Sequence, residues 1–131
     1  MRSHTFHVRT TAREQIVLIT DQVNAALRAL DAGEGVCLIF TPHTTAAISI
    51  NEDADPDVLE DLTRAFRAMV PEVDFRHGEG NSDAHFLSTL IGVSKDVPFG
   101  DGRLLLGRWQ GIYFIELDGP RTRDVIVYLR K

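Results

Sequence analysis

Alternating and continuous runs of apolar residues predict most of the strands of this chain. Residues 5–10 alternate weakly and residues 15–19 are rich in β-branched side chains, so we expect these two segments to pair as opening strands. Residues 36–41 form a short, almost continuously apolar run, which indicates a strand buried on both faces. Further strand-like segments, separated by glycine and proline turn signals, comprise residues 46–51, 104–106, 109–117 and 124–129.

Three segments between these strands carry the periodicity of amphipathic helices. The first begins at Thr20 or Asp21, and glycines stop it. The second begins at Asp55, which precedes a proline suited to the first helical turn. The third begins at Ser82 or Asp83, and its inward side chains are expected to be Leu87, Leu90 and Ile91. Three helices with strands before and after them predict an α+β fold with a largely antiparallel sheet.

The length and composition suit one soluble globular domain. We expect residues 1–131 to share one core, and 44% apolar with 25% charged residues is ordinary for such a domain. The net charge of −5 argues against a general nucleic-acid binder, because phosphate neutralisation needs clustered Lys and Arg. No run of ~20 apolar residues or signal-peptide pattern is present, so we expect no membrane association. The single cysteine, Cys37, lies in an apolar run, which favours a core thiol and a cytoplasmic location.

Three of the five histidines, His43, His77 and His85, lie in short polar stretches. Histidine is a metal ligand and a proton carrier at physiological pH, so three converging imidazoles could do either job. His43 follows a strand and Pro42, and proline cannot donate to a sheet, so the chain is expected to leave the sheet here. The alternative is a histidine bonded to a turn carbonyl. We expect the two histidines near the chain start to be structural or exposed.

Residues 77–85 contain two histidines, two acids, an amide and a hydroxyl, and they open a helix. Free N–H groups at such a helix start attract anions, including phosphate. Glycines on both sides of Glu79 let the backbone approach a ligand closely. The spacing from His77 to His85 matches no standard zinc signature, and a capped helix after a flexible loop is the alternative.

Three charged residues outside this stretch are candidates for the same site. Glu52 stands at the end of a strand, where the alternative is an exposed surface acid. Arg121 follows a Gly-Pro turn, where a planar guanidinium could clamp a carboxylate or phosphate. Glu116 interrupts an otherwise apolar strand, and it is only a solvent-facing charge if it alternates outward.

Five segments of the chain, taken in order, resemble the sequence pattern of the YjbQ family. They are His-Thr-Thr-Ala-Ala at 43–47, Asn-Glu at 51–52, Asn-Ser-Asp-Ala-His at 81–85, Leu-Gly-Arg-Trp-Gln at 106–110 and Asp-Gly-Pro-Arg at 118–121. Each segment is weak evidence, but five at compatible distances make a specific match that covers almost the whole chain. The matched site positions are His43, Glu52, His77, Asn81, Asp83, His85, Gln110, Glu116 and Arg121.

This resemblance implies a compact YjbQ-like α+β fold, built around a β-barrel-like sheet and usually assembled as a homotrimer. It also implies a pocket lined by the matched residues, in which the histidines lie close together and can hold a metal. Members of the family are described as having a weak, secondary thiamin-phosphate synthase activity, which is a transferase reaction. A low secondary rate would mean that the true substrate is another phosphorylated metabolite.

We therefore expect a metal-dependent enzyme that acts on a small phosphorylated metabolite. His43, His77 and His85 would bind a divalent metal, either zinc or, with a pyrophosphate substrate, magnesium. Glu52, Asp83 and His85 would be catalytic, by orienting an imidazole or moving a proton. The substrate-binding residues would be Asn81, Gln110, Glu116 and Arg121. The alternatives are a non-catalytic metal- or metabolite-binding trimeric module and a structural trimer whose histidines join the subunits.

Overall fold

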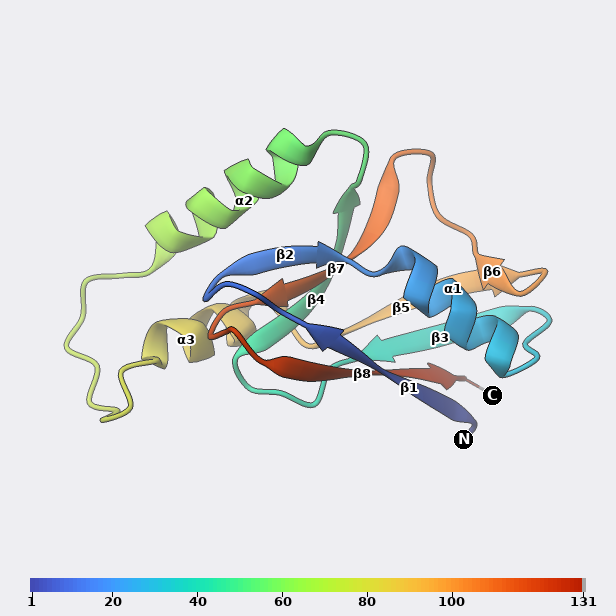
Figure 1. Cartoon of the computed structure of the whole chain (residues 1–131), viewed down its shortest axis with the longest axis horizontal. Helices are drawn as coiled ribbons and strands as arrows, with labels where there is room; N and C mark the ends of the chain where they lie inside the picture. Colours follow the sequence, from blue (N-terminus) through green and yellow to red (C-terminus); the bar gives the residue numbers. More distant parts are fainter. Residues whose placement is uncertain (131) are drawn as a thin grey trace.

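The computed structural model of this protein describes residues 1–130 and has three helices and eight strands within that range (Figure 1). The expected α+β class is therefore confirmed. In chain order the elements are β1 (Ser3–Arg9), β2 (Gln15–Leu18), α1 (Thr20–Ala29), β3 (Gly35–Phe40), β4 (Ala46–Glu52), α2 (Pro56–Met69), α3 (Ser82–Ile91), β5 (Ser94–Gly100), β6 (Arg103–Leu104), β7 (Gln110–Glu116) and β8 (Thr122–Leu129).

The strands form two sheets that curl around a shared core. The larger sheet has the order β1-β8-β3-β5-β6, and the smaller sheet has the order β2-β7-β4. All the paired strands run antiparallel, as the sequence pattern predicted. The first and last strands are neighbours, so the start of β1 and the end of β8 lie at the same end of the molecule (Figure 1).

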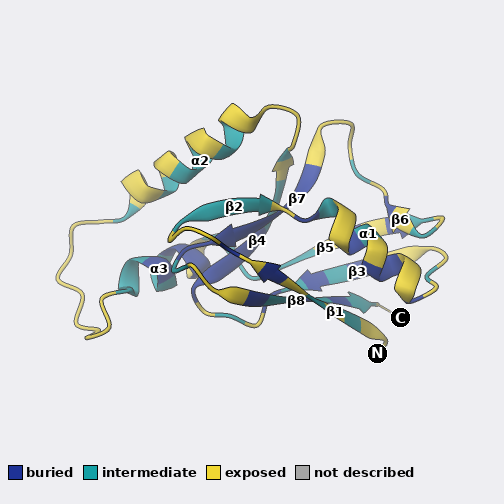
Figure 2. Cartoon of the chain, in the orientation of Figure 1, coloured by how far each residue is buried: buried dark blue, intermediate teal, exposed yellow. Residues whose placement is uncertain are grey.

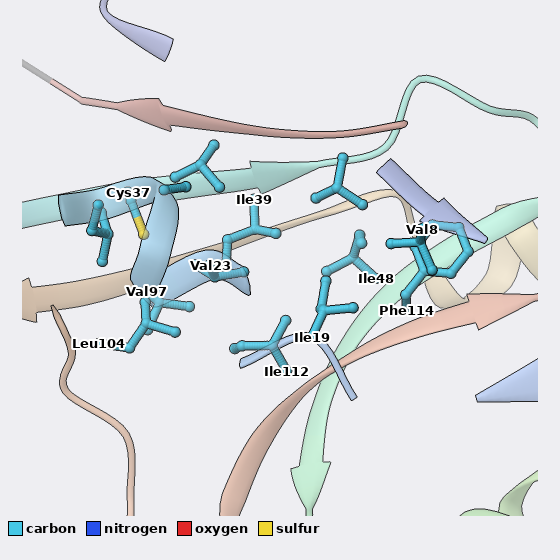
Figure 3. Packing of buried hydrophobic residues seen from close by; sticks show 14 of the residues in the cluster. Val8, Ile19, Val23, Cys37, Ile39, Ile48, Val97, Leu104, Ile112 and Phe114 are labelled. Atoms are coloured by element: carbon cyan, nitrogen blue, oxygen red, sulfur yellow. The ribbon is translucent and has the colours of Figure 1, made fainter. Parts of the chain in front are cut away.

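Side chains from both sheets and from α1 fill the space between the sheets (Figure 3). Cys37 and Ile39 of β3 and Ile112 and Phe114 of β7 belong to this core, and none of the four is exposed to solvent. The expectation for Cys37 is confirmed, and burial raises the pKa of its thiol to about 11. The expectation that β3 is buried on both faces is wrong, because alternate side chains face outward and Val36 is 39% exposed.

The helices lie where the sequence predicted, but only α2 has the predicted cap. The Asp55 side chain accepts a hydrogen bond of 2.9 Å from the Asp57 amide, and Pro56 occupies the first position of α2. The capping expected from Thr20 or Asp21 and from Ser82 or Asp83 is wrong, because the N-cap residues of α1 and α3 are Ile19 and Asn81, and neither caps through its side chain.

The helices are buried to different depths. No residue of α2 is fully buried, and its outer face is exposed (Figure 2). In α3, Leu87 is buried as expected, whereas Leu90 is 54% exposed, so the inward assignment of Leu90 is wrong.

The expected pairing of the two opening strands is also wrong. β1 pairs with β8 and β2 pairs with β7, so the two segments belong to different sheets. The chain between them bonds across to the β7–β8 turn, where the Thr10 amide donates to the Arg121 carbonyl and the Gly119 amide donates to the Arg13 carbonyl. These long-range bonds hold the first and last turns together, and local sequence patterns carry no signal for such contacts.

One strand was not predicted from the sequence. β5 contains a lysine, an aspartate and Pro98, which obscure a short alternation in which Val97 and Phe99 point into the core. The expected strand at 104–106 is confined to the two residues of β6. Among residues 1–130, no helix combines the length and the apolar composition needed to cross a bilayer.

Candidate functional site

A polar pocket of about 390 Å³ lies where β7 ends and β8 begins, beside the start of α3. Most of its side chains come from loops and strand ends, where a rigid scaffold presents polar groups without breaking its sheets. The lining residues are His43, Thr44, Thr45, His77, Glu79, Asn81, His85, Asp118, Arg121 and Arg123. All three candidate histidines line this one pocket, so their predicted convergence is confirmed.

His77 and His85 form the closest pair of imidazoles in the pocket. Their ring centroids lie 5.5 Å apart, and the ring planes meet at 76°. Two imidazoles that share one tetrahedral zinc ion would place their ring centroids about 5 Å apart, because each nitrogen lies ~2.1 Å from the metal. The spacing of this pair is therefore compatible with a shared ion.

His43 is held differently, by the backbone of Asp124. Its Nε2 accepts a hydrogen bond of 2.9 Å from the Asp124 amide, and the Thr41 hydroxyl donates to the Asp124 carbonyl at 2.9 Å. These two side chains extend the β3–β8 ladder beyond its last residue pair, Phe40 and Ile126. Burial and the neighbouring Arg123 guanidinium lower the pKa of His43, so the neutral ring is favoured.

This orientation of His43 bears on the expected metal site. In a neutral imidazole whose Nε2 accepts a hydrogen bond, Nδ1 carries the proton, and neither nitrogen then offers a free lone pair. Among residues 1–130, no three His, Cys, Asp or Glu side chains lie close enough together to hold a metal ion. Only the centroid spacing of His77 and His85 is compatible with a shared ion, whereas His43 would have to leave the Asp124 amide to become a ligand.

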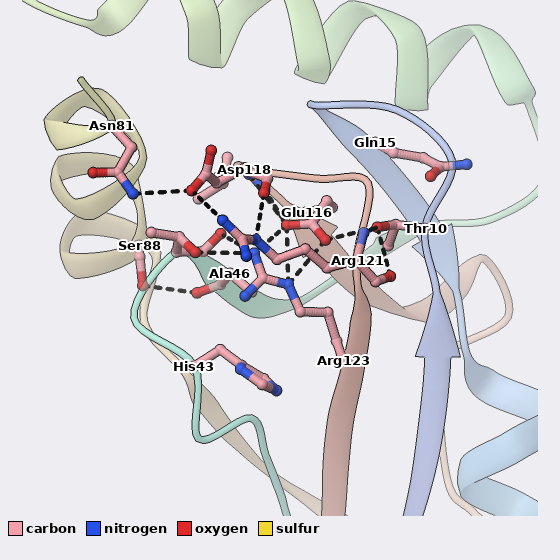
Figure 4. A network of polar contacts seen from close by, with 12 residues as sticks. Thr10, Gln15, His43, Ala46, Asn81, Ser88, Glu116, Asp118, Arg121 and Arg123 are labelled. Atoms are coloured by element: carbon pink, nitrogen blue, oxygen red, sulfur yellow. Dashed lines mark hydrogen bonds and ion pairs between the residues drawn. The ribbon is translucent and has the colours of Figure 1, made fainter. Parts of the chain in front are cut away.

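The floor of the pocket is a buried ion pair between Glu116 of β7 and Arg123 of β8 (Figure 4). The arginine Nε lies 2.9 Å and 3.1 Å from the two carboxylate oxygens, and Nη2 also donates to the carboxylate. The Thr10 hydroxyl donates to Glu116 at 2.7 Å. Glu116 has no exposed surface and Arg123 is 4% exposed, so this pair is shielded from solvent.

The same carboxylate also shapes the turn that follows β7. Backbone amides of Leu117 and Asp118 donate to Glu116 at 3.1 Å each. Any side chain at Gly119 would collide with the Ala12 carbonyl and the Glu116 side chain, so the close approach requires glycine at this position. Burial opposes ionisation of Glu116, but the hydrogen bonds from Arg123 and Thr10 outweigh it and lower its pKa.

Asp118 links this floor to the start of α3. Its carboxylate accepts a hydrogen bond of 2.9 Å from the Asn81 side-chain nitrogen and another of 3.1 Å from Nη2 of Arg121. Nε of Arg121 donates to the Asp118 backbone carbonyl. Burial acts against ionisation, yet these donors hold the pKa of Asp118 below its ordinary value. The other amide atom, Oδ1 of Asn81, is buried and has no hydrogen-bond partner among residues 1–130. A buried acceptor of this kind can take a hydrogen bond from a water molecule or a ligand, or it can contact a cation.

Several expected site residues lie elsewhere in the chain. Glu52 and Gln110 face each other at one end of the β4–β7 ladder, and Ala46 and Glu116 face each other at the other end. Six residue steps along a strand separate these ends by ~20 Å, so Glu52 and Gln110 are far from the histidines of the same chain. Their expected place in a shared pocket is therefore wrong for a single chain.

Asp83 and Glu116 also differ from expectation. Asp83 forms an ion pair with Arg13 at 3.1 Å and does not line the pocket, although Asn81 and His85, two residues to either side, do. Glu116 lies beneath the pocket and is fully buried, so it positions the arginine above it and does not bind substrate directly. The solvent-facing alternative for Glu116 is likewise excluded by its burial.

Five residues that line the pocket were not among the predicted site residues, namely Thr44, Thr45, Glu79, Asp118 and Arg123. Arg123 had a signal, because it lies two residues after Arg121 in a strand that faces Glu116, and a buried acid requires a partner. Asp118 was hidden by its turn motif, since Asp before Gly-Pro is explained by the turn alone.

The charges of the pocket nearly cancel. Arg121 pairs with Asp118 and Arg123 pairs with Glu116, while Glu79 adds a carboxylate that forms no ion pair with residues 1–130. With neutral histidines, the lining and its floor therefore carry a net formal charge of −1. An anionic ligand would need further positive charge, from a metal ion or a protonated imidazole.

Known proteins of similar sequence cover nearly the whole chain. The sequence model of a family described as "UPF0047 protein YjbQ-like" matches residues 4–131. The UPF0047 protein YugU of Bacillus subtilis is 50% identical over 126 residues, which cover 94% of this chain and 95% of YugU. The UPF0047 protein MJ1081 of Methanocaldococcus jannaschii is 44% identical over 123 residues, with coverage of 93% and 89%.

Solved structures share the fold as well. A crystal structure of an uncharacterized conserved protein of the yjbq/upf0047 family from Clostridium acetobutylicum matches with a TM-score of 0.91 and 42% identity, over 97% of this chain and 99% of that chain. A hypothetical protein from Aeropyrum pernix also matches with a TM-score of 0.91, at 37% identity over 99% and 98% of the two chains. The expected YjbQ-like arrangement of strands and helices is therefore confirmed.

The buried pair predicts a large loss of stability when one charge is removed. Glu116→Gln keeps the size of the side chain but leaves the Arg123 guanidinium without a counter-charge. Breaking a buried pair in this way should lower the free energy of unfolding by about 3 kcal/mol. Urea unfolding followed by circular dichroism at neutral pH measures the change.

Asp96→Asn is the matched control, because it removes the carboxylate of an exposed pair with Arg130. The two side chains are 46% and 55% exposed, so the loss should stay below about 1 kcal/mol. Equal losses in the two variants would contradict the structural role assigned to Glu116.

At acid pH, the free energy of unfolding of wild type should approach that of Glu116→Gln. The pKa of Glu116 is lowered from its ordinary 4.5 in the folded state, so its ionised form stabilises the fold above that pH. The contribution is lost as the pH falls from 4.5 through the lower folded pKa. Urea unfolding of both proteins from pH 7 down to about pH 3 should show their difference shrinking, and a constant difference would refute the assignment.

Proposed function

The chain belongs to the YjbQ-like UPF0047 family, and from its polar pocket we propose that it is a metal-dependent enzyme acting on a small phosphorylated metabolite. The observation that carries this proposal is the meeting of three histidines and two arginines in one pocket of about 390 Å³. Imidazoles are suited to a divalent metal, and guanidinium groups are suited to phosphate oxygens.

The charge of the pocket supports a metal requirement. A phosphate brings negative charge to a site in which each arginine is already paired and Glu79 adds a further carboxylate. His77 and His85 would hold the ion, because their spacing suits a shared ligand, and the unpartnered Oδ1 of Asn81 is an acceptor beside them. A bound divalent ion, zinc or magnesium, would supply positive charge for a departing pyrophosphate.

The arginines would bind the phosphate itself. Arg121 is 54% exposed along its side chain, and its Nη1 makes no hydrogen bond within residues 1–130. Arg123 is fixed by Glu116 and Thr45, and its Nη1 is likewise unused by the described chain. Each guanidinium thus keeps one donor group for a ligand while its other donors fix its position, which lowers the entropy cost of binding.

The weak thiamin-phosphate synthase activity described for the family fits such a pocket. In that reaction the thiazole nitrogen forms a bond to the pyrimidine methylene carbon, and the bond from that carbon to pyrophosphate breaks. Arg121 and Arg123 would hold the leaving phosphates, and His85 would move a proton or orient the substrate. The true substrate would be another phosphorylated metabolite if this rate is only secondary.

One observation favours a second candidate, a metal- or metabolite-binding module without catalysis. The two carboxylates expected to act as catalytic groups, Glu52 and Asp83, do not line the pocket of their own chain. Glu79 is the lining carboxylate that is free of ion pairs within residues 1–130. A binding module needs the histidines and arginines but no proton carrier, so turnover separates the two functions.

Turnover with the pyrimidine pyrophosphate and the thiazole phosphate tests the proposed enzyme. We expect metal-loaded wild type to form product, and His85→Ala to reduce the rate about 100-fold, the effect typical of a lost acid–base group. Zinc titration by calorimetry is the second readout, and His77→Ala should lower zinc affinity at least about 10-fold.

His4→Ala is the matched control, since His4 lies on β1 and outside the pocket. It should leave both zinc affinity and turnover unchanged. Zinc binding without product above the protein-free rate would establish the binding module instead. Equal product from wild type and His85→Ala at every enzyme concentration would refute catalysis by the pocket.

We also propose that the chain forms a homotrimer that contacts small molecules, and neither nucleic acid nor membrane. Leu105 and Trp109 support self-association, because these large apolar side chains are 57% and 56% exposed on neighbouring parts of one connection. The sequence resemblance supports three subunits. The net charge of −5 disfavours binding of nucleic acid, because phosphates repel a negatively charged protein.

Light scattering at micromolar concentration should give a mass of about three times the 14.6 kDa of one chain. Trp109→Lys should lower that mass if the residue is buried between subunits, because burying an unpaired charge is costly. Met69→Lys is the control, because Met69 is 52% exposed on α2, and it should leave the mass unchanged. A monomeric mass for wild type would refute the trimer.

A further inference from the structure

A second cavity, of about 460 Å³, adjoins the polar pocket. It lies between the loop that joins β3 to β4 and the C-terminal half of α3 with the two residues that follow it. The residues that line it are Phe40, Thr41, Pro42, His43, Thr44, His85, Ser88, Thr89, Gly92 and Val93. None of these residues carries a charge other than the two histidines, whereas the polar pocket holds four formally charged side chains.

Three of the four hydroxyl groups that line this second cavity donate to backbone carbonyls, and the fourth, that of Thr44, makes no hydrogen bond within residues 1–130. Thr41 donates to the Asp124 carbonyl, Ser88 to the Ala46 carbonyl at 2.7 Å, and Thr89 to the His85 carbonyl at 2.8 Å. A hydroxyl has a single proton to donate, so these three groups offer a ligand no further donor. Together with Phe40 and Val93, they therefore present a surface suited to an apolar group.

His43, Thr44 and His85 line both cavities, so the two cavities lie next to each other and share these side chains as their border. The position of His43 is fixed by its hydrogen bond from the Asp124 amide. A ligand seated between these side chains would place one end among the arginines and the other end against the apolar surface. The two volumes, about 390 Å³ and 460 Å³, each lie within the range of small-molecule sites.

We propose that the second cavity binds the apolar, ring-bearing part of the same ligand whose phosphate occupies the polar pocket. The ligand is then a phosphate ester of an aryl or similarly flat alcohol, and not a phosphosugar or free phosphate. This inference rests on the proposed function, because it takes the polar pocket as the phosphate site. The shared border of the two cavities at His43 and His85 carries it.

The test compares two phosphate monoesters that carry the same charge and differ only in the attached group. Calorimetry of the full-length, zinc-loaded protein with phenyl phosphate and with methyl phosphate measures the preference directly. We expect phenyl phosphate to bind at least about 10-fold more tightly, which corresponds to ~1.4 kcal/mol. Equal affinities for the two esters would overturn the inference and leave the proposed phosphate site standing.

A substitution that fills the second cavity tests whether the preference for phenyl phosphate over methyl phosphate arises there. Thr89→Trp places a large side chain at the mouth of the second cavity, and it should abolish the preference for phenyl phosphate while changing methyl phosphate affinity less than about twofold. Leu90→Trp is the matched control, because Leu90 is the next residue of α3, is 54% exposed and lines neither cavity. An unchanged preference in Thr89→Trp would overturn the inference.

Arg121→Ala separates failure of this inference from failure of the proposed function. It should weaken both esters by the same factor, since Arg121 lines only the polar pocket. If neither ester binds wild type, the proposed function fails, and benzyl alcohol then tests the second cavity alone. A shift of the Val93 methyl resonances with benzyl alcohol would support the apolar cavity, and no shift would overturn it as well.

Discussion

The buried ion pair of Glu116 and Arg123 joins the two sheets and forms the floor of the pocket. Glu116 belongs to the smaller sheet, and Arg123 belongs to the larger one. Thr10 and Thr45 complete the cluster, so segments from four parts of the chain meet at one carboxylate and one guanidinium. A buried pair is costly to desolvate and adds little stability over apolar packing. Its structural effect here is geometric, since it sets where the β7–β8 turn and the arginines lie.

The polar pocket and the second cavity lie side by side but differ in the chemistry of their lining. The polar pocket is bordered by side chains whose donors are partly committed to fixed acceptors, as Asp118 and Arg121 show. Three of the four hydroxyls that border the second cavity donate their proton to backbone carbonyls. The same physical rule, that buried polar groups find partners, thus produces a charged surface on one side of His43 and an apolar surface on the other.

The sequence predicted the helices, most strands and the meeting of the histidines, because these depend on local periodicity and on motifs that neighbour one another in the fold. It failed where long-range pairing decides the outcome. The opening strands bond to β8 and β7 through register that no local pattern encodes. Glu52 and Gln110 belong to the same family pattern as the histidines, yet they lie at the far end of the paired strands β4 and β7.

His85 belongs to a helix, whereas His77 belongs to a connection without regular secondary structure. The helix is α3, and the connection comprises residues 71–80, whose backbone hydrogen bonds join only near neighbours such as Gly80 to His77. This segment contributes little to the core, so its sequence is free to vary with small effect on folding. Ligand preference within this architecture can therefore diverge between relatives, or be re-engineered, by exchanging one connection while the sheets stay unchanged.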